Sequence, residues 1–449
     1  MQYRFKKKSE IPAFNASART SQPRLDVERF QLPNGLVLLL SENHSVPAVS
    51  INAIVLSGSR FEQDDKAGLA SLTGELIAEG TATRTSQQIA ETVESVGGRI
   101  ATFGQYETSG SALSLLSKDI RLGFEITADV LINPAFPQDK VIKQIERRIA
   151  QLRSRLDVPR TQASDKFNEI IFKGTPRHRP SVGYENTVRN ITRDDIIGFH
   201  NRHYVPNNML LAVVGDFQIA DVIKLAEETF GKWQPDPDFR VSDVALPVRQ
   251  KESVERFIHA PKEQVNIFIG HLGVERNNAD YYALLVMDTI LGSSPGFTSR
   301  IPRVLRDEQG LAYTTFSNVT SSAGIDPGRF IAYIGTSPEN LDRAMAGLRH
   351  EIRRIVEEPV TKDELEGAKS YLTGNFVFDF QTNSQIAGFL IEAEVYGLGF
   401  DYLQTYPKLI RAITIEDISE VARKHIDPHC LTTVVVGPVD ESGQVITKE

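Results

Sequence analysis

The chain has 449 residues, with 50 lysine and arginine residues against 58 aspartate and glutamate residues, so its formal net charge is −8. Hydrophobic residues make up 41% and charged residues 24%, a balance typical of globular proteins with sizeable cores, which excludes wholesale disorder. This mildly acidic composition lacks the excess of positive charge that is typical of nucleic-acid-binding proteins. The single cysteine, Cys430, excludes a disulfide framework and a cysteine-rich metal centre.

Residues 1–24 are expected to form an extension in front of the first domain. Three lysines, Lys6 to Lys8, are followed by polar residues and Pro12, where a signal peptide has a continuous apolar stretch. No apolar run in the sequence approaches the ~18–20 residues that span a bilayer. We therefore expect a cytoplasmic protein without a membrane span, or a periplasmic one if a signal peptide has been removed.

The first half of the chain predicts strands followed by helices. Asn34-Gly35 is typical of a turn between strands. The short apolar runs at 36–40 and 49–56 predict two strands. Helical periodicity follows at residues 67–79, 86–96, 118–130 and 138–156.

The two halves are separated by a polar segment without periodicity, which predicts a linker over residues 235–256. The second half opens with a predicted strand near 264–270. Further helices are predicted near 279–291, 299–308, 339–357, 361–377 and 383–397, and further strands near 313–320 and 328–335.

An internal repeat relates the halves. A predicted helix with Thr192 as N-cap leads through a proline-containing turn to an apolar run ending at Gly215, and the same pattern recurs from Thr414 to Gly437, 222 residues later. Such a repeat indicates duplicated domains, here residues 25–234 and 257–449. Because strands and helices do not alternate strictly, we expect an α+β fold with two largely antiparallel sheets, helices packed on each, in a clam-shell arrangement.

Residues 67–81, AGLASLTGELIAEGT, resemble the active-site helix of the insulinase/pitrilysin metallopeptidases, the inverzincins, whose active members carry His-x-x-Glu-His there. Residues i and i+4 share a helix face, so two histidines can bind one zinc ion, and the glutamate can take a proton from metal-bound water. The corresponding positions are Ser71, Gly74 and Glu75. Neither histidine is present, and the general-base position has no side chain.

The resemblance also implies a glutamate ligand on a later helix, seven residues after another glutamate. That spacing places Glu146 at the first position and Arg153 at the ligand position, to within one residue. A guanidinium group cannot ligate a cation, so the resemblance implies no metal or other cofactor in this chain. We expect Glu75 either to pair with Arg153 where the metal would lie or to be an ordinary exposed carboxylate, and Glu146 to be a surface residue.

The resemblance covers nearly the whole chain. Within residues 305–313, Arg306 and Tyr313 match an Arg/Tyr element that, in the family, reaches the zinc site from the second domain. A fixed cation and a phenol donor both favour negative charge developing on a carbonyl oxygen. Without the resemblance, Arg306 would be interpreted as a solvated helix residue and Tyr313 as an ordinary strand aromatic.

Some members of this family divide the two elements between paired subunits. The resemblance therefore implies the non-metal-binding subunit of a heteromeric zinc peptidase of the mitochondrial-processing-peptidase-like type, inactive alone. Its partner would be a homologue that carries His-x-x-Glu-His and the zinc, and the substrate a peptide. A structural core subunit without catalytic function, a peptide-binding homodimer and an enzyme with a displaced metal site remain alternatives.

Two further patterns do not predict a site. His203 recurs in the repeat as His425, beside a helix end, which favours capping of carbonyl groups over metal binding. Pro428 prevents His425 and His429 from sharing one helix face. The Gly-x-Ser-x-Gly pattern at 292–296 follows a helical rather than a strand period, so it predicts a turn and not a nucleophile.

Overall fold

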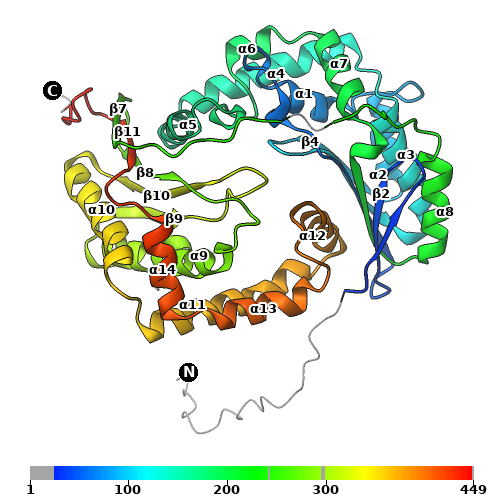
Figure 1. Cartoon of the computed structure of the whole chain (residues 1–449). Helices are drawn as coiled ribbons and strands as arrows, with labels where there is room; N and C mark the ends of the chain where they lie inside the picture. The colour runs from blue at the N-terminus through cyan, green and yellow to red at the C-terminus, as the bar shows by residue number, and fades with distance from the viewer. Residues whose placement is uncertain (1–24, 241–242, 295–298, 447–449) are drawn as a thin grey trace, which may run out of the picture.

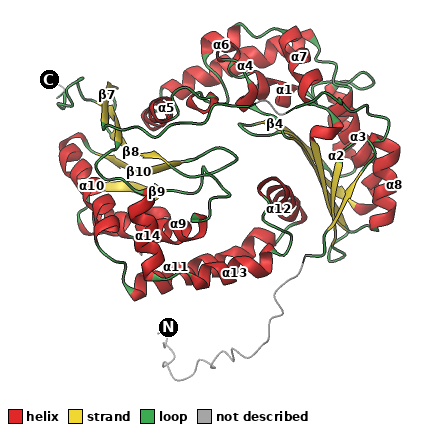
Figure 2. Ribbon diagram, viewed as in Figure 1, coloured by secondary structure: helices red, strands yellow, loops and turns green. Residues whose placement is uncertain are grey.

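The computed structural model describes residues 25–240, 243–294 and 299–446. The predicted extension, residues 1–24, lies outside this range. The chain forms two halves, each built on one sheet, and the sheets face each other across the molecule (Figure 1). Figure 2 shows most helices on the outer sides of the sheets. The α+β fold of two similar halves predicted from the sequence is confirmed.

The first half contains a six-stranded sheet in the order β1-β2-β6-β3-β5-β4. Its strands are β1 (Glu28–Gln31), β2 (Val37–Glu42), β3 (Ala48–Val55), β4 (Arg99–Gly104), β5 (Ser109–Leu116) and β6 (Met209–Gly215). Strands β2 and β6 are parallel, and the remaining pairs are antiparallel. The sheet is therefore largely antiparallel, with β4 at one edge.

The second half contains a five-stranded sheet in the order β7-β11-β8-β10-β9, which matches the first order from β2 to β4. Its strands are β7 (Val254–His259), β8 (Val265–Leu272), β9 (Ala312–Asn318), β10 (Arg329–Thr336) and β11 (Thr432–Gly437). Strands β7 and β11 are parallel, and the others pair antiparallel. Edge strand β9 thus takes the place that β4 has in the first half.

The helices are distributed over both halves. Those of the first half are α1 (Leu69–Leu76), α2 (Ser86–Ser95), α3 (Ile120–Ile132), α4 (Gln138–Leu156), α5 (Pro159–Ile171), α6 (Glu185–Arg189), α7 (Arg193–His203) and α8 (Ile219–Phe230). Those of the second half are α9 (Tyr281–Asp288), α10 (Leu341–Glu357), α11 (Lys362–Asn375), α12 (Asn383–Tyr396), α13 (Tyr402–Ala412) and α14 (Ile415–His425). No helix among the described residues is both long and apolar enough to cross a membrane.

The described part of the second half also contains four short helical segments: η7 (Thr289–Ser293) and η8 (Pro302–Glu308), which have wide π-type turns, η9 (Pro338–Asn340) and η10 (Phe376–Phe380). Gly292 and Ser293 of the Gly-x-Ser-x-Gly pattern belong to the helical segment η7, which directly follows helix α9. The strand that a nucleophile elbow requires is therefore absent at this described position. The last two residues of the pattern lie outside the described part of the chain.

The structure confirms the repeated unit. The Thr192 hydroxyl accepts a hydrogen bond from the Asp195 N–H at the start of α7, and the Thr414 hydroxyl accepts one from the Asp417 N–H at the start of α14. Each threonine is part of a capping box, which satisfies backbone donors that a helix N-terminus leaves open. Each helix then leads to a buried central strand, β6 or β11.

The halves exchange equivalent helices. Helix α5 belongs to the first half in sequence but packs on β8 and β11, where Phe167 contributes to a core with Phe268 and Val434. Helix α12 belongs to the second half but packs on β3 and β6, and Leu390 lies in one core with Leu39. Each sheet is therefore covered on one face by a helix from the other half, and the two halves share their cores.

A buried ion pair also joins the halves. The Arg60 guanidinium of the first half donates to both carboxylate oxygens of Asp326, at 2.8 and 2.9 Å, and the Tyr106 hydroxyl donates to the same carboxylate at 2.9 Å. Asp326 lies between β9 and β10. The hairpin that carries β9 is therefore held against the first half.

Candidate functional site

Helix α1 carries the three positions that correspond to the zinc motif. It starts after Gly68, whose φ of 101° is a left-handed conformation that favours glycine. The Glu62 carboxylate accepts hydrogen bonds from the N–H groups of Gly68 and Ala70, at 3.1 and 2.5 Å, and so caps the helix from outside. Burial raises the pKa of Glu62 to about 7, although these N–H groups oppose the shift.

A buried arginine from α4 occupies the region between the former ligand positions. The Arg148 guanidinium lies 2.5 Å from a carboxylate oxygen of Glu75 and donates to the Ser71 hydroxyl at 3.1 Å. Gln144, one turn earlier on α4, donates to the other carboxylate oxygen of Glu75 at 2.6 Å. The Arg148 side chain is only 2% exposed. A protein cation therefore joins α1 to α4 at the positions that the resemblance assigns to metal ligands.

The predicted pair of Glu75 with Arg153 is wrong. Arg153 is a surface residue that forms a bidentate ion pair with Glu185, at 2.8 and 3.0 Å. The reason is helix geometry: Gln144 and Arg148 are four residues apart and share a face, whereas Arg153 lies five residues further on and points elsewhere. Glu146 is exposed, as predicted.

Gly74, at the position that the resemblance assigns to the general base, has no room for a side chain. A Cβ atom on Gly74 would lie 2.2 Å from the Phe103 carbonyl oxygen, and one on Gly104 would lie 2.2 Å from the Ala70 carbonyl oxygen. Two glycines thus let the backbones of α1 and the edge strand β4 approach each other. Since no side chain fits at position 74, this face of α1 serves packing rather than proton transfer.

The residues at this site do not fit a zinc ion. A hydroxyl and one carboxylate remain of the ligand set, and both are bonded to a guanidinium, which would repel a metal cation. Across the described part of the chain, no three His, Cys, Asp or Glu side chains come together in a way that could hold a metal.

The repeated histidines have structural contacts, but they do not cap carbonyl groups as predicted. The His203 ring packs against Phe199 in a tilted arrangement, with 4.4 Å between ring centroids, and burial lowers the pKa of His203 to about 4. His425 lies 2.6 Å from a carboxylate oxygen of Asp280. The ring of one histidine is thus part of the core, and the other is half of an ion pair.

Tyr313 lies near the beginning of edge strand β9 of the second sheet, and Arg306 lies in the segment η8 that precedes it. Arg306 is in the last turn of η8, and Gly310, with φ of 63°, ends that segment before β9 begins. The Arg306 guanidinium donates to the neighbouring Asp307 at 2.8 Å, and this bond raises the pKa of Arg306. The Tyr313 side chain is 92% exposed. Its hydroxyl can therefore donate to a bound molecule.

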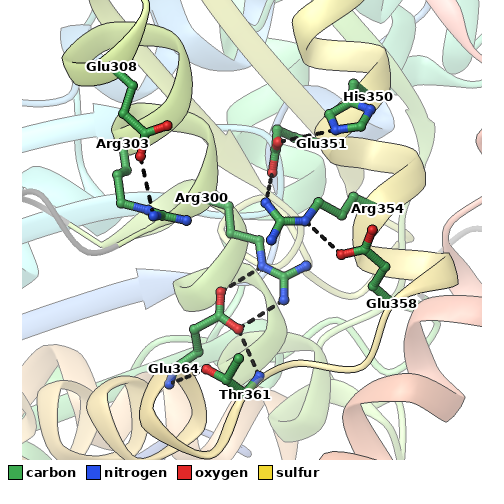
Figure 3. Close-up of polar contacts among 9 residues, drawn as sticks. All are labelled: Arg300, Arg303, Glu308, His350, Glu351, Arg354, Glu358, Thr361 and Glu364. Carbon is green, nitrogen blue, oxygen red and sulfur yellow. Dashed lines mark hydrogen bonds and ion pairs between the residues drawn. The ribbon is translucent and has the colours of Figure 1, made fainter.

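A buried ion pair anchors η8. The Arg300 guanidinium, which precedes η8, donates to both carboxylate oxygens of Glu364 at 2.8 and 2.9 Å (Figure 3). The same carboxylate accepts the Thr361 N–H at the start of α11. Burial alone would raise the pKa of Glu364, but the bonds from Arg300 and Thr361 lower it to about 2. Figure 3 also shows charged residues of α10, Glu351 and Arg354, beside Arg300. The ion pair thus holds in place the N-terminal end of the segment that carries Arg306.

Sequence reasoning missed Arg148, Gln144 and Glu62. A signal for Arg148 was present, because positions 141, 145, 148, 149 and 152 of α4 form the face that packs inward. An arginine in such an apolar stripe indicates a buried partner. Glu62 lies outside any helix in sequence, and only the fold places it at the N-terminus of α1.

Comparisons with known proteins identify the family to which this fold belongs. Residues 37–184 match the family described as insulinase (peptidase family M16), and residues 190–372 match the peptidase M16 inactive domain. An uncharacterized zinc protease of Rickettsia bellii is 27% identical over 420 residues, which cover 92% of this chain and 98% of that protein. The uncharacterized zinc protease YmxG of Bacillus subtilis is 23% identical over 362 residues, 80% of this chain and 86% of that protein.

Solved structures show the same fold. A peptidase M16 inactive domain from Pseudomonas fluorescens superposes with a TM-score of 0.87 at 23% identity, covering 94% of this chain and 100% of that one. A protease from Helicobacter pylori gives a TM-score of 0.84 at 19% identity, covering 92% of this chain and 99% of that one. The two adjacent family matches, the duplicated fold and the altered metal positions lead to one conclusion: this chain belongs to the insulinase (M16) peptidase family.

Proposed function

We propose that this chain is the non-metal-binding subunit of a heteromeric zinc peptidase. Its partner would be a homologous subunit with an intact His-x-x-Glu-His motif, and the two together would cleave peptides. The zinc ion of the partner would supply the activated water. This chain would contribute Arg306 and Tyr313 and would cleave nothing alone.

The observation that carries the proposal is a contrast between two sites in one chain. The metal positions on α1 are filled by the buried Arg148, so this chain lacks a place for the catalytic ion. Tyr313 is almost fully exposed near the start of edge strand β9, and Arg306 lies seven residues before it, in the segment η8 that leads into the strand. A tyrosine with this exposure presents its hydroxyl donor to a molecule bound at the surface.

The chemistry of the two side chains suits the proposed role. The carbonyl oxygen of a peptide becomes negatively charged when water attacks, and a guanidinium and a phenol donor held in place stabilise that charge. The bond to Asp307 orients the Arg306 guanidinium, which carries its positive charge in any case. The free edge of β9 would also offer backbone groups to an extended peptide.

The test mixes this chain with a homologous subunit that carries His-x-x-Glu-His and measures cleavage of a fluorogenic peptide. We expect activity only in the mixture, and a loss of about 100-fold in kcat/KM for Arg306→Ala and for Tyr313→Phe, since one oxyanion donor contributes about that factor. Arg303→Ala on the same segment and Tyr184→Phe are matched controls that should retain activity.

Two results would overturn the proposal. Zinc-dependent cleavage by the pure single chain would show a metal site of its own. Full activity of the Arg306 and Tyr313 variants in the mixture would show that this chain supports its partner only structurally, as a core subunit does. Peptide binding without any cleavage would favour a peptide-binding homodimer.

A further inference from the structure

A second candidate site lies in the second half, between η10, α12 and α13. It is a cavity of about 420 Å³. Five aromatic side chains line it: Phe376, Phe380, Phe389, Tyr402 and Tyr406. It contains neither Arg306 nor Tyr313 and none of the former metal positions.

The aromatic rings hold each other in a fixed arrangement. Phe376 stacks on Tyr406 with 4.1 Å between ring centroids, and Phe389 stacks on Tyr402 at 5.6 Å. Phe380 meets the edges of its neighbours at 5.0 Å. Ring faces carry partial negative charge, so a wall of this kind attracts an organic cation.

The one cation in the wall is already compensated. The Arg276 guanidinium lies 4.0 Å above the Tyr281 ring, 3.3 Å from a carboxylate oxygen of Glu392 and 3.2 Å from the Tyr402 hydroxyl. Its charge is therefore balanced by Glu392. Arg276 forms the back of the cavity rather than a site for an anion.

Asp379 supplies a carboxylate that is not compensated. Among the described residues, no hydrogen bond or ion pair joins its side chain to another group, and loss of hydration is the cause that raises its pKa. The carboxylate lies close enough to Tyr406 to raise the pKa of that phenol as well. The cavity thus combines aromatic faces with one unpaired negative charge.

A glycine keeps the cavity open on the side of α12. Gly388 lies in the middle of the helix, where glycine costs about 1 kcal/mol relative to alanine. A Cβ atom on Gly388 would meet nothing within 4 Å, so close packing does not require glycine there. The other face of α12 packs on the sheet of the first half, which fixes the wall in place.

Two exposed apolar residues of η10 stand between the cavity-lining residues Phe376 and Asp379 in sequence. Val377 and Phe378 are 53% and 54% exposed, although both are large and apolar. A ligand that carries an apolar group next to a cationic group would cover these two side chains with the apolar group while the cationic group enters the cavity. A peptide segment with a basic residue beside an apolar residue has that form.

We propose that this cavity binds the arginine or lysine side chain of a peptide substrate. The aromatic rings receive the cationic group, Asp379 pairs with it, and Val377 and Phe378 contact the neighbouring apolar residue. The assignment of the ligand as a peptide substrate rests on the proposed function. The binding itself needs no partner subunit and no cleavage.

The test is calorimetric titration of this chain alone with acetyl-arginine amide and with the neutral isostere acetyl-citrulline amide. We expect the arginine compound to bind about tenfold more tightly or better, because a desolvated cation on aromatic faces gains that much. Asp379→Asn should remove this preference. Gly388→Phe should abolish binding of both compounds by filling the cavity.

Asp65→Asn is the matched control, since it removes one exposed carboxylate outside the cavity and should leave binding unchanged. Thermal unfolding of each variant confirms that it is folded. Equal binding of the two compounds, or an unchanged preference in Asp379→Asn, would overturn the proposal. Arg306→Ala should retain arginine binding, so failure of the peptidase proposal and failure of this one give different results.

Discussion

The two regions that correspond to the parts of a zinc peptidase site have opposite characters in this chain. On α1 and α4, polar side chains are buried and bonded to each other through Arg148, and the helix backbone lies against β4. At η8 and β9, Arg306 pairs with its sequence neighbour and Tyr313 extends into solvent. The first region has become part of the core, and the second has kept reactive groups on the surface.

Under the proposed function, Arg148 would take the structural place of a metal ion between α1 and α4. A metal ion that joins two helices contributes to folding as well as chemistry. A guanidinium can supply the same cross-link, because it is cationic and offers several donors in one plane. It cannot activate water. Mutations in the buried region at α1 and α4 should therefore lower the stability of the protein. Mutations in the exposed region at η8 and β9 should instead lower its activity.

The largest expected effect is on stability at the former metal region. Arg148→Met leaves Gln144 as the remaining donor to the Glu75 carboxylate and should lower the free energy of unfolding by about 3 kcal/mol, the upper end of the range for a charged group that loses a hydrogen-bonded partner. Arg153→Met, five residues away on the surface, should cost at most about 1 kcal/mol. Urea unfolding measures both. Equal losses of stability in the two variants would show that Arg148 is no more important for the fold than the surface residue Arg153.

A second effect concerns the contact of α1 with β4. Gly74→Ala places a methyl group 2.2 Å from the Phe103 carbonyl oxygen and should cost about 2–3 kcal/mol through overpacking. Gly198→Ala, in α7 with open space around its Cβ position, should instead stabilise the protein by up to about 1 kcal/mol. If Gly74→Ala were neutral, α1 would have room for a general base after all.

A third effect is pH-dependent and tests the anchor of η8. The pKa of Glu364 is lowered from 4.5 to about 2 in the folded chain, so its contribution is complete above pH 4.5 and is lost as the pH falls toward 2. Glu364→Gln should lower stability at pH 7 by about 1–2 kcal/mol. The difference from the unaltered protein should shrink between pH 4.5 and 2. A constant difference would contradict the assignment.

The smallest expected effect is on the stability of the Arg/Tyr variants. Arg306→Ala and Tyr313→Phe alter side chains at the surface and should change the free energy of unfolding by about 0.5 kcal/mol or less. Their melting curves should coincide with that of the unaltered chain while peptidase activity of the mixture falls. A large loss of stability would show that Arg306 and Tyr313 have a structural role instead of a functional one.

Much of the fold could be predicted from local patterns. Helix α4 has the same bounds as the predicted segment, and the capping threonines Thr192 and Thr414 mark their helices in both copies of the repeat. Strands β4 and β5 were not predicted, because β4 is half-exposed and β5 is rich in serine and glycine. Strand β5 depends on pairing with β3, which lies far away in sequence, and β4 depends on pairing with β5.

By itself, the sequence determined the duplicated α+β architecture, the loss of the zinc-binding side chains on α1 and the presence of Arg306 and Tyr313. These properties follow from periodicity, spacing and residue chemistry, which are local. Only the tertiary structure decided that Arg148, and not Arg153, meets Glu75, that Glu62 caps α1, and that α5 and α12 exchange sheets. The physical reason is that a rotation of one residue along a helix redirects a side chain by about 100°, and only packing against a neighbour settles which face turns inward.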